Sequence, residues 1–347
     1  MTPAPPPPSV PSEAPQNLPE PSNNASTSAA AQSGLAWWTV PMAALGGALG
    51  ALQALINSTL AQDIQSGFGA AAISFGVGLV LVAGIVLLRP ALRSRTADFW
   101  RDLRSGAFSW PLALGGLGGA LFVLSQALTV PTIGVALLII AVVAGQTVTG
   151  LVVDLIGLGP GGARPLSAGR LAGAALMVVA VALAMSGGLQ RAVPIPLLIL
   201  PLIAGCALGL QQAVNGRVTQ HSGHFLVATL GNFIVGTFAL VLAAAAHFLF
   251  AGWPLPLPAE PLLYLGGVIG VGFIAIASFL AEPMGVLALA MCTIAGQIIG
   301  SVFLDATVSH APLGLLTVVG ALLTLVAAVV TVGLPPARQR GTSSRAL

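Results

Sequence analysis

From residue 36 to residue 334 the chain consists almost entirely of apolar runs, separated by short breaks of proline, glycine and polar residues. Each run is about 20 residues long, which is the length an α-helix needs to cross the hydrocarbon core of a bilayer. Barrel strands would appear instead as shorter segments of alternating polarity. Charged residues make up 6% of the chain, against about 25% in soluble domains, so a water-soluble fold would lack a charged surface. The sequence therefore predicts an all-α integral membrane protein with ten transmembrane helices, at residues 36–56, 69–89, 109–129, 133–153, 168–187, 194–214, 226–249, 262–281, 285–304 and 312–334.

An even number of spans places both ends of the chain on one side of the membrane. Eleven of the twelve arginines then lie on that side, five of them between Arg89 and Arg104, and Arg191 lies alone on the other. Segments rich in Arg and Lys next to membrane spans stay in the cytoplasm. We therefore expect a multi-pass protein of the cell (inner) membrane with cytoplasmic termini. The basic charge follows from topology, so nucleic acid is not expected as a partner.

Residues 1–34 have a different composition from the rest of the chain. They are rich in Pro, Ser and Asn and lack the basic and apolar segments of a signal peptide. Such a segment cannot bury enough apolar surface to fold, and it is predicted to be a disordered tail.

Polar residues recur at two fixed spacings inside the apolar runs. A shift of 158 residues aligns Gln53, Asn57 and Ser74 with Gln211, Asn215 and Asn232. A shift of 151 residues aligns GQTVTGLVVD at 145–154 with GQIIGSVFLD at 296–305, and it also aligns three glycines at 115–119 with three at 266–270. These matches indicate a duplicated unit of five helices.

Because five is an odd number, the second copy must cross the membrane in the opposite sense. The loop at 89–106 is rich in arginine, whereas its counterpart at 251–261 has none, which agrees with this inversion. Inverted repeats are a common plan of secondary transporters. The predicted organisation is a tail at 1–34, a first five-helix repeat at 35–188, a second, inverted repeat at 189–335 and a basic tail at 336–347.

Three motifs carry a family resemblance. The pattern G-x5-Q-x3-N occurs at 47–57 and 205–215, [SN]-F-x-x-G at 74–78 and 232–236, and G-Q-x7-D at 145–154 and 296–305. With these motifs, residues 40–334 resemble the YdcZ-type branch of the drug/metabolite transporter superfamily. Some members are single five-helix units, and this chain resembles a fused pair. The resemblance implies a secondary transporter with an EamA-like fold.

Residue spacing suggests where a solute could bind. Gln53 and Asn57 share one helix face because they lie four residues apart, and Gln211 and Asn215 do the same. Inversion then places one polar set at each mouth, with Asp305 beside the outer set and Asp154 beside the inner. We expect Gln146 and Gln297, about 12 Å along their helices from these acids, to contact solute near the midplane. The candidate solute-binding residues are Gln146, Gln297, Gln53, Gln211, Asn57, Asn215, Ser74 and Asn232, and Asp154 and Asp305 are candidates for gating or ion coupling.

A structural interpretation of the same residues stands beside the functional one. Amides between membrane helices often only bond a neighbouring helix. Asp154 could be tethered to Arg164 or Arg170, and Glu282 could be a solvated turn residue.

The function expected from the sequence is secondary transport of a small solute by alternating access. A neutral, zwitterionic or weakly cationic metabolite is favoured because arginine is absent from the span centres. The alternatives are a non-transporting scaffold or accessory subunit, and a passive channel. No cofactor, metal site or enzymatic activity is expected, since the chain shows no phosphate loop, Cys/His metal spacing or acid–nucleophile arrangement. The expected partners are the solute and the lipid bilayer, and a homodimer is left open.

Overall fold

The computed structural model describes residues 38–159, 162–163, 168–190, 193–308 and 313–333, apart from the side chains at 170, 187–190, 277–279, 281–291 and 331–333. Both tails expected from the sequence, the side chain of Glu282 and the suggested tethers Arg164 and Arg170 lie outside this description. Every regular element in the described part is helical. The elements are α2 (Thr39–Asp63), α3 (Gly67–Leu88), α4 (Pro90–Ser105), the 3₁₀ turn η1 (Trp110–Gly115), α5 (Gly116–Ile156), α6 (Ala168–Gln190), α7 (Ile195–Ser222), α8 (Phe225–Ala251), the 3₁₀ turn η2 (Pro261–Tyr264), α9 (Gly266–Thr307) and α10 (Leu315–Gly333). The prediction of an all-α fold is confirmed.

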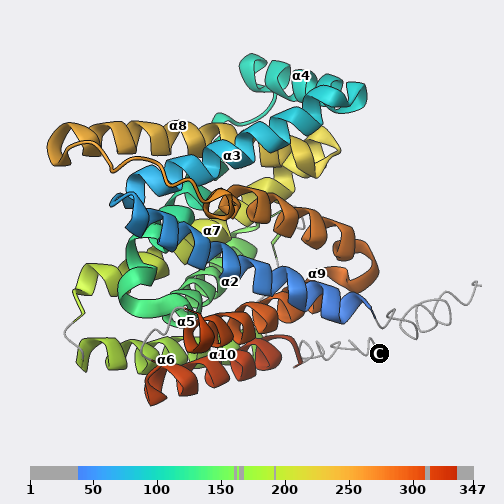
Figure 1. Cartoon of the computed structure of the whole chain (residues 1–347). Helices are drawn as coiled ribbons and strands as arrows, with labels where there is room; N and C mark the ends of the chain where they lie inside the picture. Colours follow the sequence, from blue (N-terminus) through green and yellow to red (C-terminus); the bar gives the residue numbers. More distant parts are fainter. Residues whose placement is uncertain (1–37, 160–161, 164–167, 191–192, 309–312, 334–347) are drawn as a thin grey trace, which may run out of the picture. The chain divides into compact units, whose positions relative to one another are not determined.

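The expected spans fall on these helices (Figure 1). Spans three and four are joined in α5, which breaks at Gly134, where φ is 82° and ψ is 166°. Spans eight and nine fall together on α9. Within the described residues, five helices are long and apolar enough to cross a bilayer, and shorter apolar helices occur in α6, α9 and α10.

The two repeats meet around a pair of aromatic rings. Phe75 on α3 and Phe233 on α8 are equivalent positions, and their ring centroids lie 5.1 Å apart. A methyl group on Gly78 would collide with Phe233, and one on the equivalent Gly236 would collide with Phe75. Each repeat therefore makes the same contact with the other, as expected of a pseudo-twofold axis. Helices α6 and α10, which are also equivalent, lie side by side (Figure 1).

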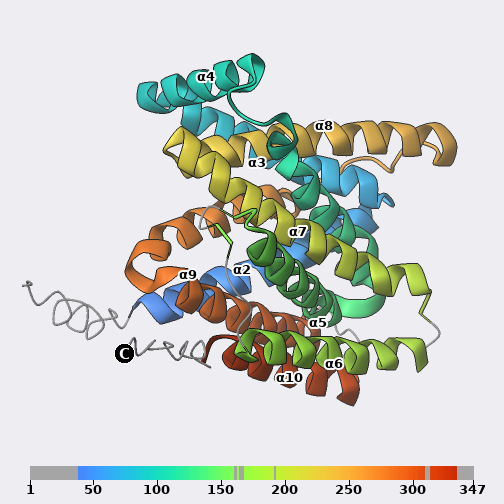
Figure 2. The ribbon, with the colours of Figure 1, turned by 180° about the vertical axis from the view of Figure 1, so that it is seen from behind.

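The closest packing joins helices of different repeats. Helix α2 lies against α9 and the equivalent α7 lies against α5, as the views from both sides show (Figures 1 and 2). Gly47 on α2 touches the carbonyl of Thr293, and the equivalent Gly205 on α7 touches the carbonyl of Val142. Small residues allow this approach, and membrane helices rely on it because lipid offers no hydrophobic driving force for association.

Span four forms the centre of the helical core. Every residue from Val135 to Gly145 is buried, and Leu138, Ile139 and Ile140 pack against Met177 of α6 and Ile298 of α9. A helix that is buried all round needs apolar residues on every face, which explains the uninterrupted sequence ALLIIAVVA at 136–144.

The arginine-rich segment that we treated as a loop contains a helix, α4. Its start is set by the extended Arg89 before Pro90 at the first helical position, and its end by Gly106 in the left-handed region at φ 79°. Leu92, Phe99 and Leu103 are buried along one face. The loop interpretation missed this helix because its apolar residues are too few to form a membrane run.

Candidate functional site

Gln53 and Asn57 of α2 and Ser74 of α3, here called the first polar set, face the start of α9. A methyl group on Gly266 would overlap Asn57 Oδ1 and lie 3.0 Å from Ser74 Oγ. One on Gly270 would lie 2.7 Å from Gln53 Nε2. The set is sealed, because Asn57 is 0% and Ser74 2% exposed. The glycines of α9 thus provide the space that these polar side chains occupy.

Asn57 also contacts a residue that the repeat comparison did not select. Its Nδ2 donates a hydrogen bond of 2.7 Å to Oε1 of Gln126, on the part of α5 before the Gly134 break. Gln126 is fully buried. Its counterpart in the second repeat is Ala277, so a search for duplicated polar residues passes over it. The only sequence signal was an amide within an apolar run.

Gln211 and Asn215 of α7 and Asn232 of α8, the second polar set, repeat this arrangement against the start of α5. A methyl group on Gly115 would lie 3.3 Å from Asn215 Oδ1, and one on Gly119 would lie 3.1 Å from Gln211 Oε1. Asn232 Nδ2 donates to Asn215 Oδ1 at 2.8 Å. Both polar sets therefore occupy glycine-lined notches at equivalent places.

The second polar set borders a pocket. Asn215 and Asn232 line this pocket together with Val218, and Phe99 and Trp100 of α4 form another wall. In the described structure the pocket therefore lies between the second polar set, which belongs to the second repeat, and α4, which belongs to the first.

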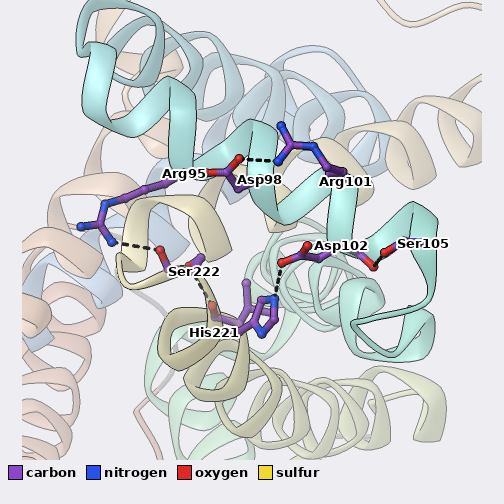
Figure 3. A network of polar contacts seen from close by, with 8 residues as sticks. Arg95, Asp98, Arg101, Asp102, Ser105, His221 and Ser222 are labelled. Carbon is purple, nitrogen blue, oxygen red and sulfur yellow. Dashed lines mark hydrogen bonds and ion pairs between the residues drawn. The ribbon is translucent and has the colours of Figure 1, made fainter.

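Helix α4 is attached to the α7–α8 corner by polar contacts at the edge of this pocket (Figure 3). His221 Nε2 lies 2.8 Å from Asp102 Oδ2. Arg95 donates to the carbonyl of Ser222 at 3.1 Å. The His221 ring also lies 4.9 Å from that of Phe108. These contacts are partly exposed, so they position α4 more than they stabilise the fold.

A further titratable group lies at this corner. His224 precedes α8 and accepts a hydrogen bond from the Leu226 N–H at 3.2 Å through Nδ1. Burial, and then the positive charges of Arg95 and Arg89, lower the pKa of His224 below its ordinary value of 6.5. The neutral imidazole is therefore favoured, and only the neutral form can accept this bond.

The two deeper glutamines lie in separate helix contacts. Gln297 Nε2 is 3.3 Å from the place of a methyl group on Gly50, so Gln297 lies against α2. Gln146 is half-buried, and its backbone lies against Gly209 of α7. Among the described contacts none joins Gln146 to Gln297, and their shared role in solute binding stays a prediction.

The two acids occupy equivalent ends of α5 and α9. Asp305 is 2% exposed, and its two carboxylate oxygens accept the N–H groups of Val135, at 2.9 Å, and Ala136, at 2.7 Å. These are the first donors of the helix that follows the Gly134 break, where a negative charge is stabilising. Asp154 is half-buried near the end of α5. The described contacts therefore give Asp305 a structural partner, and they leave both gating and ion coupling untested.

The end of α5 has an additional cation that the sequence reading did not identify. Arg217 of α7 donates to the carbonyls of Leu158, at 2.6 Å, and Gly157, at 3.0 Å. Its equivalent in the first repeat is Thr59, which carries no charge.

Two segments of the sequence match one protein family. Residues 38–183 and residues 196–330 each match the family described as "Putative inner membrane exporter, YdcZ". The two matches coincide with the two five-helix repeats, which confirms the resemblance and the two-repeat membrane fold predicted from the sequence. A search of curated proteins returned no match. The chain therefore belongs to the YdcZ family of multi-pass membrane transporters and carries two copies of the family's unit in one polypeptide.

Proposed function

We propose that the protein moves a small solute across the inner membrane by alternating access, with the two polar sets exposed in turn. The observation that carries this proposal is the unequal state of two equivalent sites. The first polar set is sealed against Gly266, whereas the second borders a pocket beside α4. A carrier caught with one mouth closed has this property.

The arginines suggest the direction in which the pocket faces. Arg93, Arg95 and Arg104 lie on α4, which forms one wall of the pocket. Basic segments next to membrane spans stay in the cytoplasm. The pocket would then face the cytoplasm, with both termini on that side. An exporter, as the family description reads, would take up its solute from this side.

The polar sets also suggest the class of solute. Their side chains are amides and one hydroxyl, which can bond an uncharged or zwitterionic molecule without a counter-ion. The family description supports transport and offers no support for an enzymatic activity.

Alternating access can be tested by chemical labelling that requires no known solute. Ser74→Cys and Asn232→Cys are placed, singly and together, in protein whose native Cys206 and Cys292 are replaced by alanine. A membrane-impermeant maleimide is then added to either side of proteoliposomes. Each cysteine should react from its own side only, and labelling of one should slow the reaction of the other.

The control is Ser109→Cys, an exposed position before η1 on the α4 side, which should react from that side in either state. Simultaneous reaction of both site cysteines would indicate a channel. Reaction of each cysteine from its own side with no effect of one label on the other would support the scaffold alternative.

A further inference from the structure

The first polar set continues into a cluster of buried polar atoms without partners. The bond between Asn57 and Gln126 uses one N–H and one carbonyl. Asn57 Oδ1, Gln126 Nε2 and Ser74 Oγ are buried and have no hydrogen-bond partner among the described residues. Each such atom costs about 1–3 kcal/mol when left unpaired in a protein interior. A cluster of them is therefore a costly feature for a role in packing alone.

These atoms lie close to one another. The two oxygens, from Asn57 and Ser74, both approach the single position where Gly266 lacks a side chain. Gln126 Nε2 belongs to the amide that Asn57 already contacts. Because both Oδ1 and Nε2 are unpaired, the two amides do not form the reciprocal pair of bonds that amides can form. Each amide therefore keeps one polar atom without a hydrogen bond, an acceptor on Asn57 and a donor on Gln126.

Duplication explains Asn57 and Ser74, which have polar equivalents in Asn215 and Asn232, but it does not explain Gln126. The residues equivalent to Ser125 and Gln126 in the second repeat are Ile276 and Ala277. Gln126 and Ser125 are both 0% exposed. The first repeat has thus placed an amide at a fully buried position where the second repeat has a methyl group. A polar group that serves only the shared fold would be expected in both repeats.

We propose that Asn57, Gln126 and Ser74 form the specificity site for an uncharged solute that carries an N–H donor next to a carbonyl acceptor, as in a primary carboxamide or a lactam. Asn57 Oδ1 accepts the solute N–H, Gln126 Nε2 donates to its carbonyl, and Ser74 Oγ bonds either group. This assignment rests on the transport function proposed above. The site is occluded in the described conformation and opens when the start of α9 moves away from α2.

Binding to the purified full-length protein tests this assignment with matched probes. Nicotinamide and uracil carry the donor next to the acceptor. Methyl nicotinate and 1,3-dimethyluracil keep the acceptor and lose the donor, and nicotinate is charged. Isothermal titration should show binding of nicotinamide or uracil, with the other three at least about tenfold weaker, because a site built to hydrogen-bond a group rejects the analogue that lacks it. If neither nicotinamide nor uracil binds, the proposal is wrong.

The key variant is Gln126→Met, which keeps the side-chain volume and helix propensity and removes both hydrogen-bonding groups. It should weaken nicotinamide or uracil binding at least about tenfold. Thr237→Val is the matched control, since Thr237 Oγ1 is another buried atom without a partner in the described part of the chain, outside the cluster. It should leave the affinity unchanged. Ser74→Ala, a smaller change, should weaken binding several-fold and serves if Gln126→Met fails to fold.

A purely structural role for Gln126 gives a different result. Gln126→Met would then lower the unfolding temperature while the folded fraction binds the probes as tightly as the wild type, and the proposal would be wrong. The maleimide labelling separates this failure from a failure of the transport proposal. If the two cysteines label alternately in protein that binds none of the probes, alternating access is supported and only the proposed solute class is wrong.

Discussion

The first and second polar sets arose from one duplicated unit, yet they are found in different surroundings. Asn57 is fully buried, is bonded to Gln126 and touches Gly266. Its equivalent Asn215 is half-buried, is bonded to Asn232 and lines a pocket. One close backbone contact recurs at both sets, because Gly267 lies against the carbonyl of Ser74 and the equivalent Gly116 lies against the carbonyl of Asn232. Equivalent polar sets of the two repeats therefore lie in different surroundings in the described structure.

Different segments lie beside the two polar sets. Beside the second set stands α4, an amphipathic helix with Phe99 and Trp100 at the pocket wall. Beside the first set lie η2 and the extended segment before it, where the Leu255 N–H bonds the carbonyl of Ile64 at the end of α2. Tyr264 packs with Leu60 of α2 and bonds the carbonyl of Pro258 at 2.7 Å. A segment bonded to the backbone of α2 is held more firmly than a helix attached by partly exposed polar contacts.

The largest difference between the two sets should come from adding one methyl group. Gly266→Ala places it on Asn57 Oδ1, which cannot retreat without breaking its bond to Gln126. Gly115→Ala, the equivalent change, meets its nearest atoms at 3.1 Å or more, beside a pocket into which they can shift. We expect Gly266→Ala to cost about 3 kcal/mol and Gly115→Ala about 1 kcal/mol or less. Thermal unfolding in detergent compares them, and equal losses would mean that the first notch is no tighter than the second.

Truncating the equivalent asparagines should separate the sets by a smaller amount. Asn57→Ala leaves Gln126 with no partner in a sealed site, at a cost of about 2 kcal/mol. Asn215→Ala leaves Asn232 beside a pocket, where water can replace the lost partner, so the cost should be below about 1 kcal/mol. Chemical unfolding of the purified variants measures both. A larger loss for Asn215→Ala would reverse the assignment of which site is closed.

Substituting the two acids tests whether both repeats contain the helix cap that the structure shows for Asp305. Asp305→Asn keeps one acceptor for the N–H groups of Val135 and Ala136 and loses the other, which should cost about 1–2 kcal/mol. The inverted repeat predicts that Asp154 caps the equivalent Val286 and Leu287, in a stretch whose contacts lie outside the description. Asp154→Asn should then cost a similar amount in the same unfolding assay. If Asp154→Asn does not change the stability, the cap is present in one repeat only.

Sequence reasoning succeeded where duplication marked the residues. The shifts that align Gln53 with Gln211 and Gly115 with Gly266 identified helices whose close contacts the structure repeats in both halves. Polar residues are rare in membrane helices, so their recurrence is a strong signal.

The same method could not find features that belong to one repeat or to the backbone. The equivalent of Gln126 is an alanine, and the buried face of α4 consists of only three residues among those described. The partner of Asp305 is a pair of backbone N–H groups exposed by the break at Gly134, and backbone donors leave no mark in a sequence. Whether Gln146 and Gln297 border one cavity depends on helix rotations that spacing alone does not fix.

The smallest expected difference concerns the caps of two equivalent helices. Ser66 caps α3 by accepting the Gly69 N–H at 3.1 Å, and the equivalent His224 caps α8 by accepting the Leu226 N–H. The hydroxyl of Ser66 does not titrate, whereas the pKa of His224 is lowered from 6.5 by burial and by the charges of Arg95 and Arg89. In the unfolded chain His224 therefore binds a proton at a higher pH than in the folded protein. Its cap is fully effective above pH 6.5, and the stability it contributes falls as the pH drops below that value towards the lowered pKa.

Replacing His224 with the residue found at the equivalent cap isolates this effect. His224→Ser keeps a side-chain acceptor and removes the titration, so the variant should lose less stability than the wild type between about pH 7.5 and pH 5.5. His221→Gln in the same series accounts for the neighbouring imidazole that pairs with Asp102. Thermal unfolding at both pH values measures the difference. An unchanged acid sensitivity in His224→Ser would show that the cap of α8 is as insensitive to pH as that of α3, and would remove this distinction between the repeats.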